Sequence, residues 1–221
     1  MILEMLARPK VRQPVRRALN GSSNGKSHPA AGEERLMVSG VAWERYEELD
    51  RALGDDRPGP RLYFLEGEME IMSTSLLHEQ IKKWLAMLVE DYLFESGEEI
   101  FPHGQATLKR LREAGAEPDE SWCFGEDKER PDLVLEIALT SGGLSKLDVY
   151  RRFGVPEVWL WRKSALEVWT LRRDGAAYDG PAKKSRALPG LDLALLTRCL
   201  KQPTWRGARR AFREALRKSA R

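Results

Sequence analysis

The sequence predicts a single α/β (α+β) domain, and two features of its 221 residues support this prediction. An apolar segment at 131–139 is followed by a helical segment at 144–153 and a second apolar segment at 155–161. A strand, a helix and a strand within about thirty residues form a βαβ unit, whose outer strands run parallel. With 42% hydrophobic and 32% charged residues, the chain is also apolar enough to build a folded core.

Turn-forming residues and the spacing of apolar residues predict the other elements. Strands are expected where apolar runs lie between turns, and helices where apolar residues recur every three or four positions. In the first half of the chain we expect a helix at 41–53 capped by Ser39, strands at 62–65 and 69–72, and a helix after 73–75 that ends near Phe94 and Gly97. A strand near 100–108, a polar excursion at 109–115 and a strand at 117–124 should follow. After the βαβ unit we expect a hairpin of 166–171 with 176–178 and helices at 191–200 and 205–218.

Basic residues gather at the two ends of the chain. Residues 8–35 contain seven basic and two acidic side chains, and residues 198–221 contain nine basic and one acidic. The net charge of the whole chain is only +3, so the middle of the chain is acidic. We therefore expect a flexible basic arm at 1–35, an ordered domain at 36–200 and a basic helix at 201–221.

This charge distribution bears on the partners of the protein. Basic tails often bind nucleic acid through its phosphates, although they also serve solubility. An acidic body is a poor binder of a polyanion unless a cation mediates, which indicates a metal site. The chain has 2 cysteines, no signal-peptide pattern and no apolar run of the roughly 18 residues that span a membrane, so we expect a cytoplasmic protein with no membrane attachment.

Glu136 interrupts the apolar strand at 131–139 and is the strongest candidate for chemistry. A carboxylate in a strand covered on both faces is costly unless it is paired, protonated or bound to a cation. Asp132 projects from the same face, and Asp119 on the preceding strand can approach Glu136 if the two strands pair as a hairpin. Converging carboxylates suit Mg²⁺ or Mn²⁺. A structural salt bridge for Glu136 and a turn role for Asp119 are the alternatives.

Lys146 opens the helix after this strand, where its amine could polarise a water or contact a phosphate. A solvated lysine is the plainer interpretation of this residue. His78 begins an earlier helix beside Glu79, and a structural, hydrogen-bonded histidine is equally the plainer interpretation there. Glu68 follows a turn, where acidic residues are common.

The motifs of several other chemistries are absent from the sequence. Cys123 has no CxxC motif and no Cys/His ligand set, which argues against zinc. There is no G-x-x-x-x-G-K-[ST], no G-x-G-x-x-G and no G-x-S-x-G. These absences argue against nucleotide hydrolases, Rossmann enzymes and α/β-hydrolases.

Taken in order, these segments resemble the Uma-two family of restriction-endonuclease-like proteins, which belongs to the PD-(D/E)XK nuclease superfamily. The resemblance covers about residues 38–200, and its most specific part is the Gly-Val-Pro-Glu-Val-Trp run that follows a lysine-bearing helix. The segments that carry the resemblance are Tyr63–Ser73, His78-Glu79, Glu117–Asp119, Arg130–Glu136, Lys146–Tyr150 and Gly154–Trp159.

The resemblance implies a mixed sheet flanked by helices, with a divalent metal (Mg²⁺ or Mn²⁺) at a strand hairpin. Asp119 resembles the aspartate of the superfamily motif and Glu136 its glutamate, with Asp132 as a second candidate for the aspartate. Ala138 stands where E-x-K would place a lysine, and the resemblance suggests that Lys146 supplies the amine instead. The remaining candidates are Glu68 or Glu79 as a further acid, and His78, which matches a histidine of the family pattern.

These inferences predict a metal-dependent endonuclease that hydrolyses phosphodiester bonds in nucleic acid, with DNA the expected substrate. One alternative is an inactive nuclease-fold module that binds nucleic acid or protein, since a fold does not secure a function. The other is an interaction protein, and a homodimer is compatible with all three interpretations. The contact surface of the interaction protein would consist of the basic C-terminal helix and the tryptophans Trp159, Trp161 and Trp169. Core packing is the plainer interpretation of these tryptophans.

Overall fold

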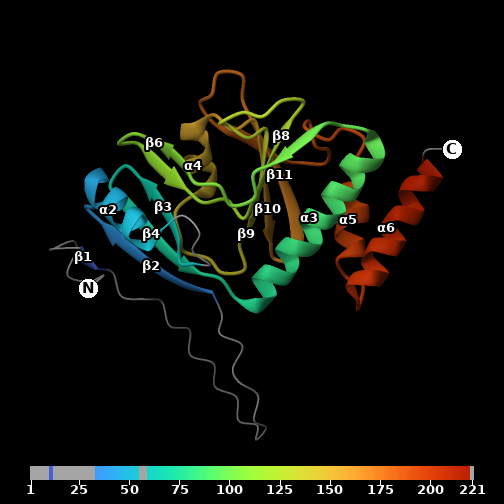
Figure 1. Ribbon diagram of the computed structural model, residues 1–221, viewed down its shortest axis with the longest axis horizontal. Helices are drawn as coiled ribbons and strands as arrows, with labels where there is room; N and C mark the ends of the chain where they lie inside the picture. The colour runs from blue at the N-terminus through green and yellow to red at the C-terminus, as the bar shows by residue number, and fades with distance from the viewer. Residues whose placement is uncertain (1–9, 12–32, 55–58, 220–221) are drawn as a thin grey trace, which may run out of the picture.

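Two β-sheets and the helices packed against them form the fold (Figure 1). The computed structural model describes residues 10–11, 33–54 and 59–219. In this part of the chain the strands form two six-stranded sheets, in the orders β1-β2-β4-β3-β7-β6 and β12-β11-β10-β9-β8-β5. Helices accompany both sheets, so the predicted α/β class is confirmed.

The first sheet is antiparallel at each of its pairings. Helix α2 (Trp43–Leu53) packs against it, and the buried rings of Trp43, Tyr46 and Phe64 lie in mutual contact there. The strands of this sheet are β1 (Lys10–Val11), β2 (Glu34–Ser39), β3 (Arg61–Leu65), β4 (Glu68–Ser73), β6 (Leu108–Arg110) and β7 (Ala114–Ala116).

The second sheet is mixed, because β9 and β10 run parallel and the other neighbours run antiparallel. Helix α4 (Lys146–Phe153) connects the parallel strands, so the predicted βαβ unit is confirmed. The strands of this sheet are β5 (Ile100–Pro102), β8 (Glu120–Phe124), β9 (Leu133–Ile137), β10 (Glu157–Arg162), β11 (Ala165–Leu171) and β12 (Tyr178–Ala182).

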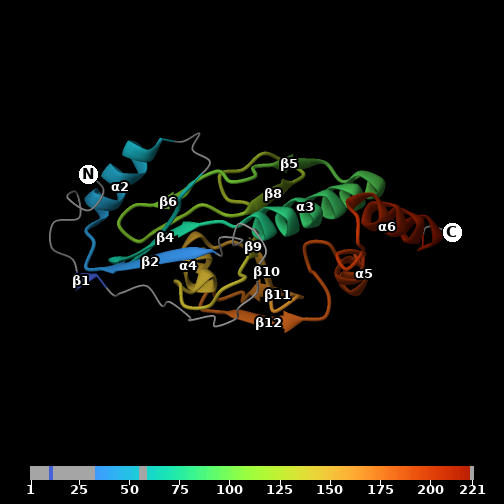
Figure 2. The same cartoon turned by 90° about the horizontal axis from the view of Figure 1, so that it is seen from below.

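Strand β9 is buried on both faces. Leu133 and Leu135 belong to a core with α3 (Leu76–Ser96), α5 (Leu193–Cys199) and α6 (Trp205–Ser219), which group at one end of the molecule (Figures 1 and 2). Val134, on the opposite face, packs with α4 and residues of the first sheet. This double coverage explains the near-continuous apolar sequence of β9. Glu136 lies on the Val134 face, which is the face between the two sheets.

Serine caps and glycine stops fix the two helices that matter most for the site. The Ser75 side chain accepts a hydrogen bond from the backbone N–H at His78, and Gly97 ends α3 in the left-handed conformation. Ser145 caps α4 in the same way, and Gly154 ends it. These contacts satisfy backbone groups at the helix ends and set the directions in which the first-turn residues project.

Three local expectations are wrong. Ser39 does not cap α2, because it ends β2 and its hydroxyl donates to Glu68, while Ala42 occupies the N-cap without a side-chain hydrogen bond. The single strand expected near 100–108 is divided between the two sheets as β5 and β6. The polar excursion expected at 109–115 instead forms the β6–β7 hairpin, whose turn includes Arg112 with a φ of 61°. Pairing with β3 stabilises this hairpin, which local sequence cannot reveal.

The ends of the chain differ in how much is described. The expected arm lies largely outside the described residues, apart from Lys10–Val11, which pairs with β2, and residues from 33 onward. At the other end, α6 packs against α3 and α5, and Phe212 is fully buried between them. None of the helices in the described ranges is long and apolar enough to cross a membrane.

We expect Phe212→Ala to lower the free energy of unfolding by about 3 kcal/mol, because truncating a buried aromatic side chain leaves a cavity. Arg217→Ala, on the exposed side of the same helix, should change it by less than about 0.5 kcal/mol. Urea unfolding followed by circular dichroism measures both. Equal effects of the two substitutions would contradict the packing of α6 into this domain.

Candidate active site

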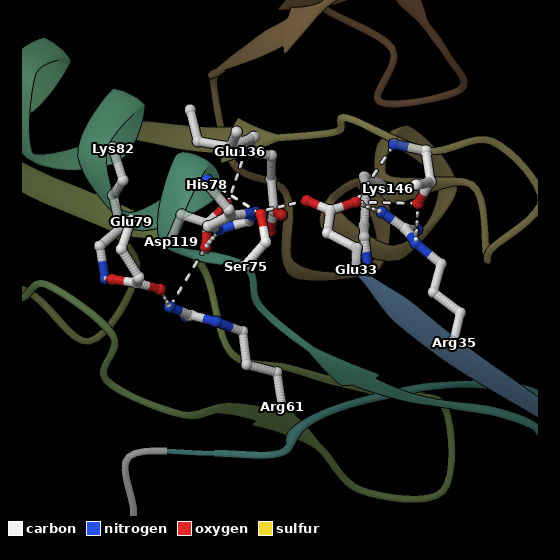
Figure 3. A network of polar contacts seen from close by, with 12 residues as sticks. Glu33, Arg35, Arg61, Ser75, His78, Glu79, Lys82, Asp119, Glu136 and Lys146 are labelled. Carbon is white, nitrogen blue, oxygen red and sulfur yellow. Dashed lines mark hydrogen bonds and ion pairs between the residues drawn. The ribbon is translucent and has the colours of Figure 1, made fainter. Parts of the chain in front are cut away.

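The candidate site lies between the two sheets, beside the first turn of α3. Its side chains come from the segment before β2, from β3 and β4, from the region of β8 and β9, and from the starts of α3 and α4 (Figure 3). Most of them are charged and nearly inaccessible to solvent. Because buried charges are costly unless they are paired, such a concentration is typical of a functional site.

The pairing of β8 with β9 places Asp119 and Glu136 opposite each other. Glu120 lies across from Leu135, so the next position in this antiparallel register sets Asp119 against Glu136. Both side chains are buried, at 0% and 1% exposure. The backbone N–H of Ile137 donates to Asp119 Oδ2 at 2.7 Å and holds that carboxylate at the end of β9. The β8–β9 pairing on which the expected approach depended is present, and its register places Asp119 beside Glu136.

Cationic side chains surround Asp119. His78 Nε2 lies 2.7 Å from Asp119 Oδ1, and Arg61 Nη2 lies 3.2 Å from the same oxygen. Burial alone would raise the pKa of Asp119, but the hydrogen bond from His78 and the charge of Arg61 outweigh it and lower this pKa. Asp119 is therefore ionised at neutral pH.

Glu136 has a different environment, in which its partners are hydroxyl groups. Tyr63 Oη lies 3.1 Å from both carboxylate oxygens, and the Tyr150 hydroxyl contacts Oε1. Among the described residues, no lysine or arginine forms an ion pair with Glu136. Burial and the nearby charge of Asp119 raise the pKa of Glu136 from its ordinary value of 4.5 to about 7.

The hydrogen bonds of Tyr63 agree with this raised pKa. Its hydroxyl carries one proton and also lies 2.7 Å from the carbonyl oxygen of Glu117, which accepts hydrogen bonds only. When that proton is donated to the carbonyl, the contact with Glu136 needs a proton from the carboxyl group. Tyr63 therefore divides its one proton between the carbonyl and Glu136, and among the described residues only the Tyr150 hydroxyl has Glu136 as its sole acceptor, so these hydrogen bonds do not offset the effect of burial.

His78 connects Asp119 to a second carboxylate (Figure 3). Its Nδ1 lies 2.6 Å from Glu33 Oε1, and Glu33 in turn accepts from the backbone and hydroxyl of Thr140, just after β9. Burial would lower the pKa of His78, but its hydrogen bonds to Asp119 and Glu33 raise this pKa to about 9. At neutral pH, His78 is thus a buried cation held between two carboxylates.

Lys146 projects from the start of α4 into the same interior. Its Nζ lies 3.3 Å from Glu70 Oε1 and over the ring of Tyr63, the residue whose hydroxyl contacts Glu136. Burial lowers the pKa of Lys146, although the charges of Glu70 and Glu136 oppose this shift. Lys146 is therefore an interior amine rather than the solvated lysine that the sequence also allowed.

Arg61 and Glu79 form the opposite side of the site. Arg61 Nη2 lies 3.7 Å from Glu79 Oε1, and Lys82 Nζ lies 2.6 Å from Glu79 Oε2. Arg61 also donates to the carbonyl oxygen of Pro118, immediately before Asp119. Glu79 is 38% exposed, so this is the side on which the charged cluster reaches solvent.

Two predicted candidates lie outside this cluster. Asp132 precedes β9, where it accepts from the backbone N–H of Phe124 and pairs with Lys128 at 2.6 Å. Glu68 is exposed at the start of β4 and accepts from Ser39. Sharing a strand face with Glu136 does not bring Asp132 near it, because four residues span about 13 Å along a strand.

Several residues of the cluster were not expected from the sequence. Some of them lie within the strands β3 and β4 or before the expected start of the domain, and two lie in the loop before β8 and in helix α4. The residues of this set are Glu33, Arg35, Arg61, Tyr63, Glu70, Glu117 and Tyr150. A buried polar residue inside a strand was the available signal for Arg61 and Glu70, as it was for Glu136.

The donor set fits a divalent cation that prefers oxygen. The Asp119 carboxylate offers about four lone-pair positions, and contacts with His78, Arg61 and Ile137 use three of them. Glu136 is a buried carboxylate with hydroxyl partners and no ion pair among the described residues. A cation placed between these two groups would be held by Asp119 and Glu136, which are ligands that suit Mg²⁺ or Mn²⁺.

We expect the stability of the metal-free protein to fall as pH rises from 6.5 to 9. A histidine whose pKa is raised by folding stabilises the native state fully below its unfolded pKa, and this contribution disappears above the folded pKa. The loss attributable to His78 is on the order of 2–3 kcal/mol. Urea midpoints in EDTA across this range measure it.

His78→Gln keeps a donor for Asp119 but cannot become charged, so this fall with pH should largely disappear in the variant. His103→Gln, which removes a histidine outside the cluster, should retain it. An identical pH dependence in His78→Gln and the unaltered protein would show that His78 is not charged in the native state.

Comparisons with known proteins bear on this arrangement. The family model Uma2, described as "Putative restriction endonuclease", matches residues 43–201. A search of curated proteins found no significant match. Among solved structures, a nuclease described as putative and assigned to DUF820, from Anabaena variabilis ATCC 29413, is similar, with a TM-score of 0.51 and 11% sequence identity over 72% of this chain and 98% of that chain.

At this identity the solved structure supports the fold alone, whereas the family match covers well over half of the chain. The matched range contains Asp119, Glu136, Lys146 and His78. The family resemblance found in the sequence is thereby confirmed. The chain belongs to the Uma2 family.

Proposed function

We propose that this protein is a divalent-metal-dependent endonuclease that hydrolyses phosphodiester bonds in DNA. The observation that carries the proposal is the buried pair of Asp119, directly before β8, and Glu136 on β9, with the pKa of Glu136 raised to about 7 by burial and by the charge of Asp119. A buried carboxyl group with a raised pKa and no ion pair among the described residues is one whose charge a bound cation would compensate. Membership of a nuclease family supports a nucleic acid as the substrate.

The side chains around the pair would have separate roles in such a reaction. A divalent cation bound by Asp119 and Glu136 would supply a water of lowered pKa and positive charge opposite a phosphate. The buried amine of Lys146 can orient a water or take its proton, because burial lowers its pKa. Arg61 and His78 hold Asp119 in place.

Lys146 can replace the lysine that the E-x-K pattern places two residues after the glutamate. Ala138 occupies that position, and its N–H donates to the carbonyl oxygen of Trp161. Lys146 reaches the interior from α4, over the ring of Tyr63, and interacts electrostatically with Glu136. An amine supplied from a neighbouring helix therefore approaches the same carboxylate.

A non-catalytic nucleic-acid-binding module is the second candidate. The observation in its favour is that Arg61 and His78, both cationic, already contact Asp119 and compensate its charge. If these contacts replace a metal rather than assist it, the fold would bind nucleic acid without cleaving it. The experiment below separates the two functions.

We expect the purified protein to nick supercoiled plasmid in Mg²⁺ or Mn²⁺ and to lose this activity in EDTA. Glu136→Gln should lower the rate by about 100-fold or more, because it removes a carboxylate ligand and the charge that goes with it. Glu167→Gln is the matched control in the same sheet and should cleave normally, since Glu167 pairs with Arg162 near the surface. Plasmid binding without cleavage by all three proteins would favour the binding module.

We also expect Glu136→Gln to stabilise the metal-free protein at pH 8, by an amount on the order of 2 kcal/mol. An acid whose pKa is raised in the native state destabilises it above that pKa and has no such effect below its unfolded pKa. The gain should therefore disappear near pH 4.5. Urea unfolding in EDTA at both pH values measures it, and a less stable variant at pH 8 would contradict the buried, uncompensated charge.

A further inference from the structure

A second cluster of ligand-type side chains lies at the edge of the second sheet. His103 follows β5, Cys123 lies on β8, and Asp127 lies in the turn after β8. Among the residues that the structure describes, one ligand atom from each of these three lies within 4.8 Å of the other two. His103 Nε2 is 2.6 Å from Asp127 Oδ1, and Cys123 Sγ is 3.9 Å from both ring nitrogens of His103.

We propose that His103, Cys123 and Asp127 bind a divalent transition metal of the zinc class. A thiolate, an imidazole and a carboxylate are ligands that Zn²⁺ and Co²⁺ accept, whereas Mg²⁺ prefers oxygen alone. The site is therefore chemically distinct from the pair of Asp119 and Glu136. The proposal does not depend on nuclease activity.

The distances are close to those that a tetrahedral metal requires. Bonds of about 2.3 Å to sulfur and about 2.0 Å to nitrogen place those two atoms roughly 3.5 Å apart. The 3.9 Å from Cys123 Sγ to each ring nitrogen of His103 is slightly longer than this, and the partly exposed end of the cluster lets the imidazole turn one nitrogen toward a shared metal position. The 2.6 Å between His103 Nε2 and Asp127 Oδ1 must lengthen by about 0.7 Å to fit two metal bonds of about 2.0 Å. Asp127 can move because its side chain is 68% exposed.

The sheet fixes two of the three ligands before any metal arrives. Phe101 lies opposite Cys123 in the pairing of β5 with β8, and the backbone N–H of His103 donates to the carbonyl oxygen of Ser121 at 2.9 Å. The turn that carries Asp127 is held by the N–H of Gly125, which donates to the carbonyl oxygen of Glu99. Little conformational entropy remains to be lost when the ligands converge.

Charge and solvent access also suit a metal of this class. One thiolate and one carboxylate neutralise a divalent cation, which lowers the cost of holding it in a partly buried place. Cys123 is buried, while His103 is 20% and Asp127 68% exposed, so the cluster opens to solvent past Asp127. Three protein ligands leave a fourth position for water.

This site would join the short edge strand β5 to the turn between β8 and β9. Cys123 on β8 lies four residues after Asp119, which directly precedes this strand, and four extended residues span about 13 Å. The expectation against zinc at Cys123 rested on the absence of a Cys/His ligand set in the sequence. The fold supplies His103 from the segment after β5, twenty residues earlier in the chain, which local spacing could not reveal.

Titration of the full-length, tag-free, metal-free protein with Co²⁺ tests the proposal, because a cobalt–thiolate bond absorbs in the near ultraviolet. We expect one equivalent of Co²⁺ to produce this band, Zn²⁺ to remove it and Mg²⁺ to leave it unchanged. Cys123→Ser should abolish the band, while Cys199→Ser, which alters the other buried cysteine, should retain it. Glu136→Gln should also retain it, which separates this site from the proposed nuclease site.

A second variant, Asp127→Asn, separates loss of a metal ligand from loss of the fold. This side chain is exposed, so it can change without disturbing the core. It should weaken Co²⁺ binding by about 10-fold or more while the urea midpoint of the metal-free protein stays the same. The proposal is overturned if the unaltered protein shows no cobalt–thiolate band, if the band survives in Cys123→Ser, or if Asp127→Asn binds Co²⁺ with unchanged affinity.

Discussion

The pairing of β8 with β9 is the constraint on which the candidate site depends. It sets Asp119 against Glu136 in the interior, where two carboxylates of like charge cannot both be ionised without compensation. The two carboxylates have different partners. Asp119 receives the cations Arg61 and His78, while Glu136 receives two tyrosine hydroxyls and keeps a pKa near neutrality.

The first sheet supplies partners for both of these carboxylates. Arg61 and Tyr63 on β3 contact Asp119 and Glu136, so the first sheet supplies groups that the carboxylates of the second sheet need. Glu33 and Glu70 extend the network to Thr140 and Lys146, which lie after β9 and at the start of α4. Removing one member of such a network would leave a buried charge without its partner, so its residues are expected to be strongly interdependent.

Much of the fold could be predicted from the sequence, because the decisive patterns are local. The βαβ unit followed from two apolar strands around a short helix, and the glycine stops at Gly97 and Gly154 were correct. The β6–β7 hairpin could not be predicted, because its polar strands are stabilised by pairing with β3 rather than by their own composition.

The candidate site could also be predicted only in part. Asp119, Glu136, Lys146 and His78 were identified from an out-of-place charge or from the family resemblance, and the structure brings them together. Asp132 was misleading, because a shared strand face does not imply proximity. Glu33, Arg61 and the two tyrosines come from distant segments, so only the tertiary fold shows that they meet. The sequence alone therefore identified Glu136 as a residue that is costly to bury. The structure was needed to identify the groups that lower this cost.

The central claim is that Glu136 is a buried carboxyl group that gives up a proton when a cation binds. Calorimetric titration of Mg²⁺ at pH 6.5, in two buffers of different ionisation enthalpy, measures this proton release directly. We predict that protons are released on binding at pH 6.5, that fewer are released at pH 8.5, and that Glu136→Gln binds Mg²⁺ weakly and releases none. Equal Mg²⁺ affinity and equal proton release in Glu136→Gln and the unaltered protein would contradict the account.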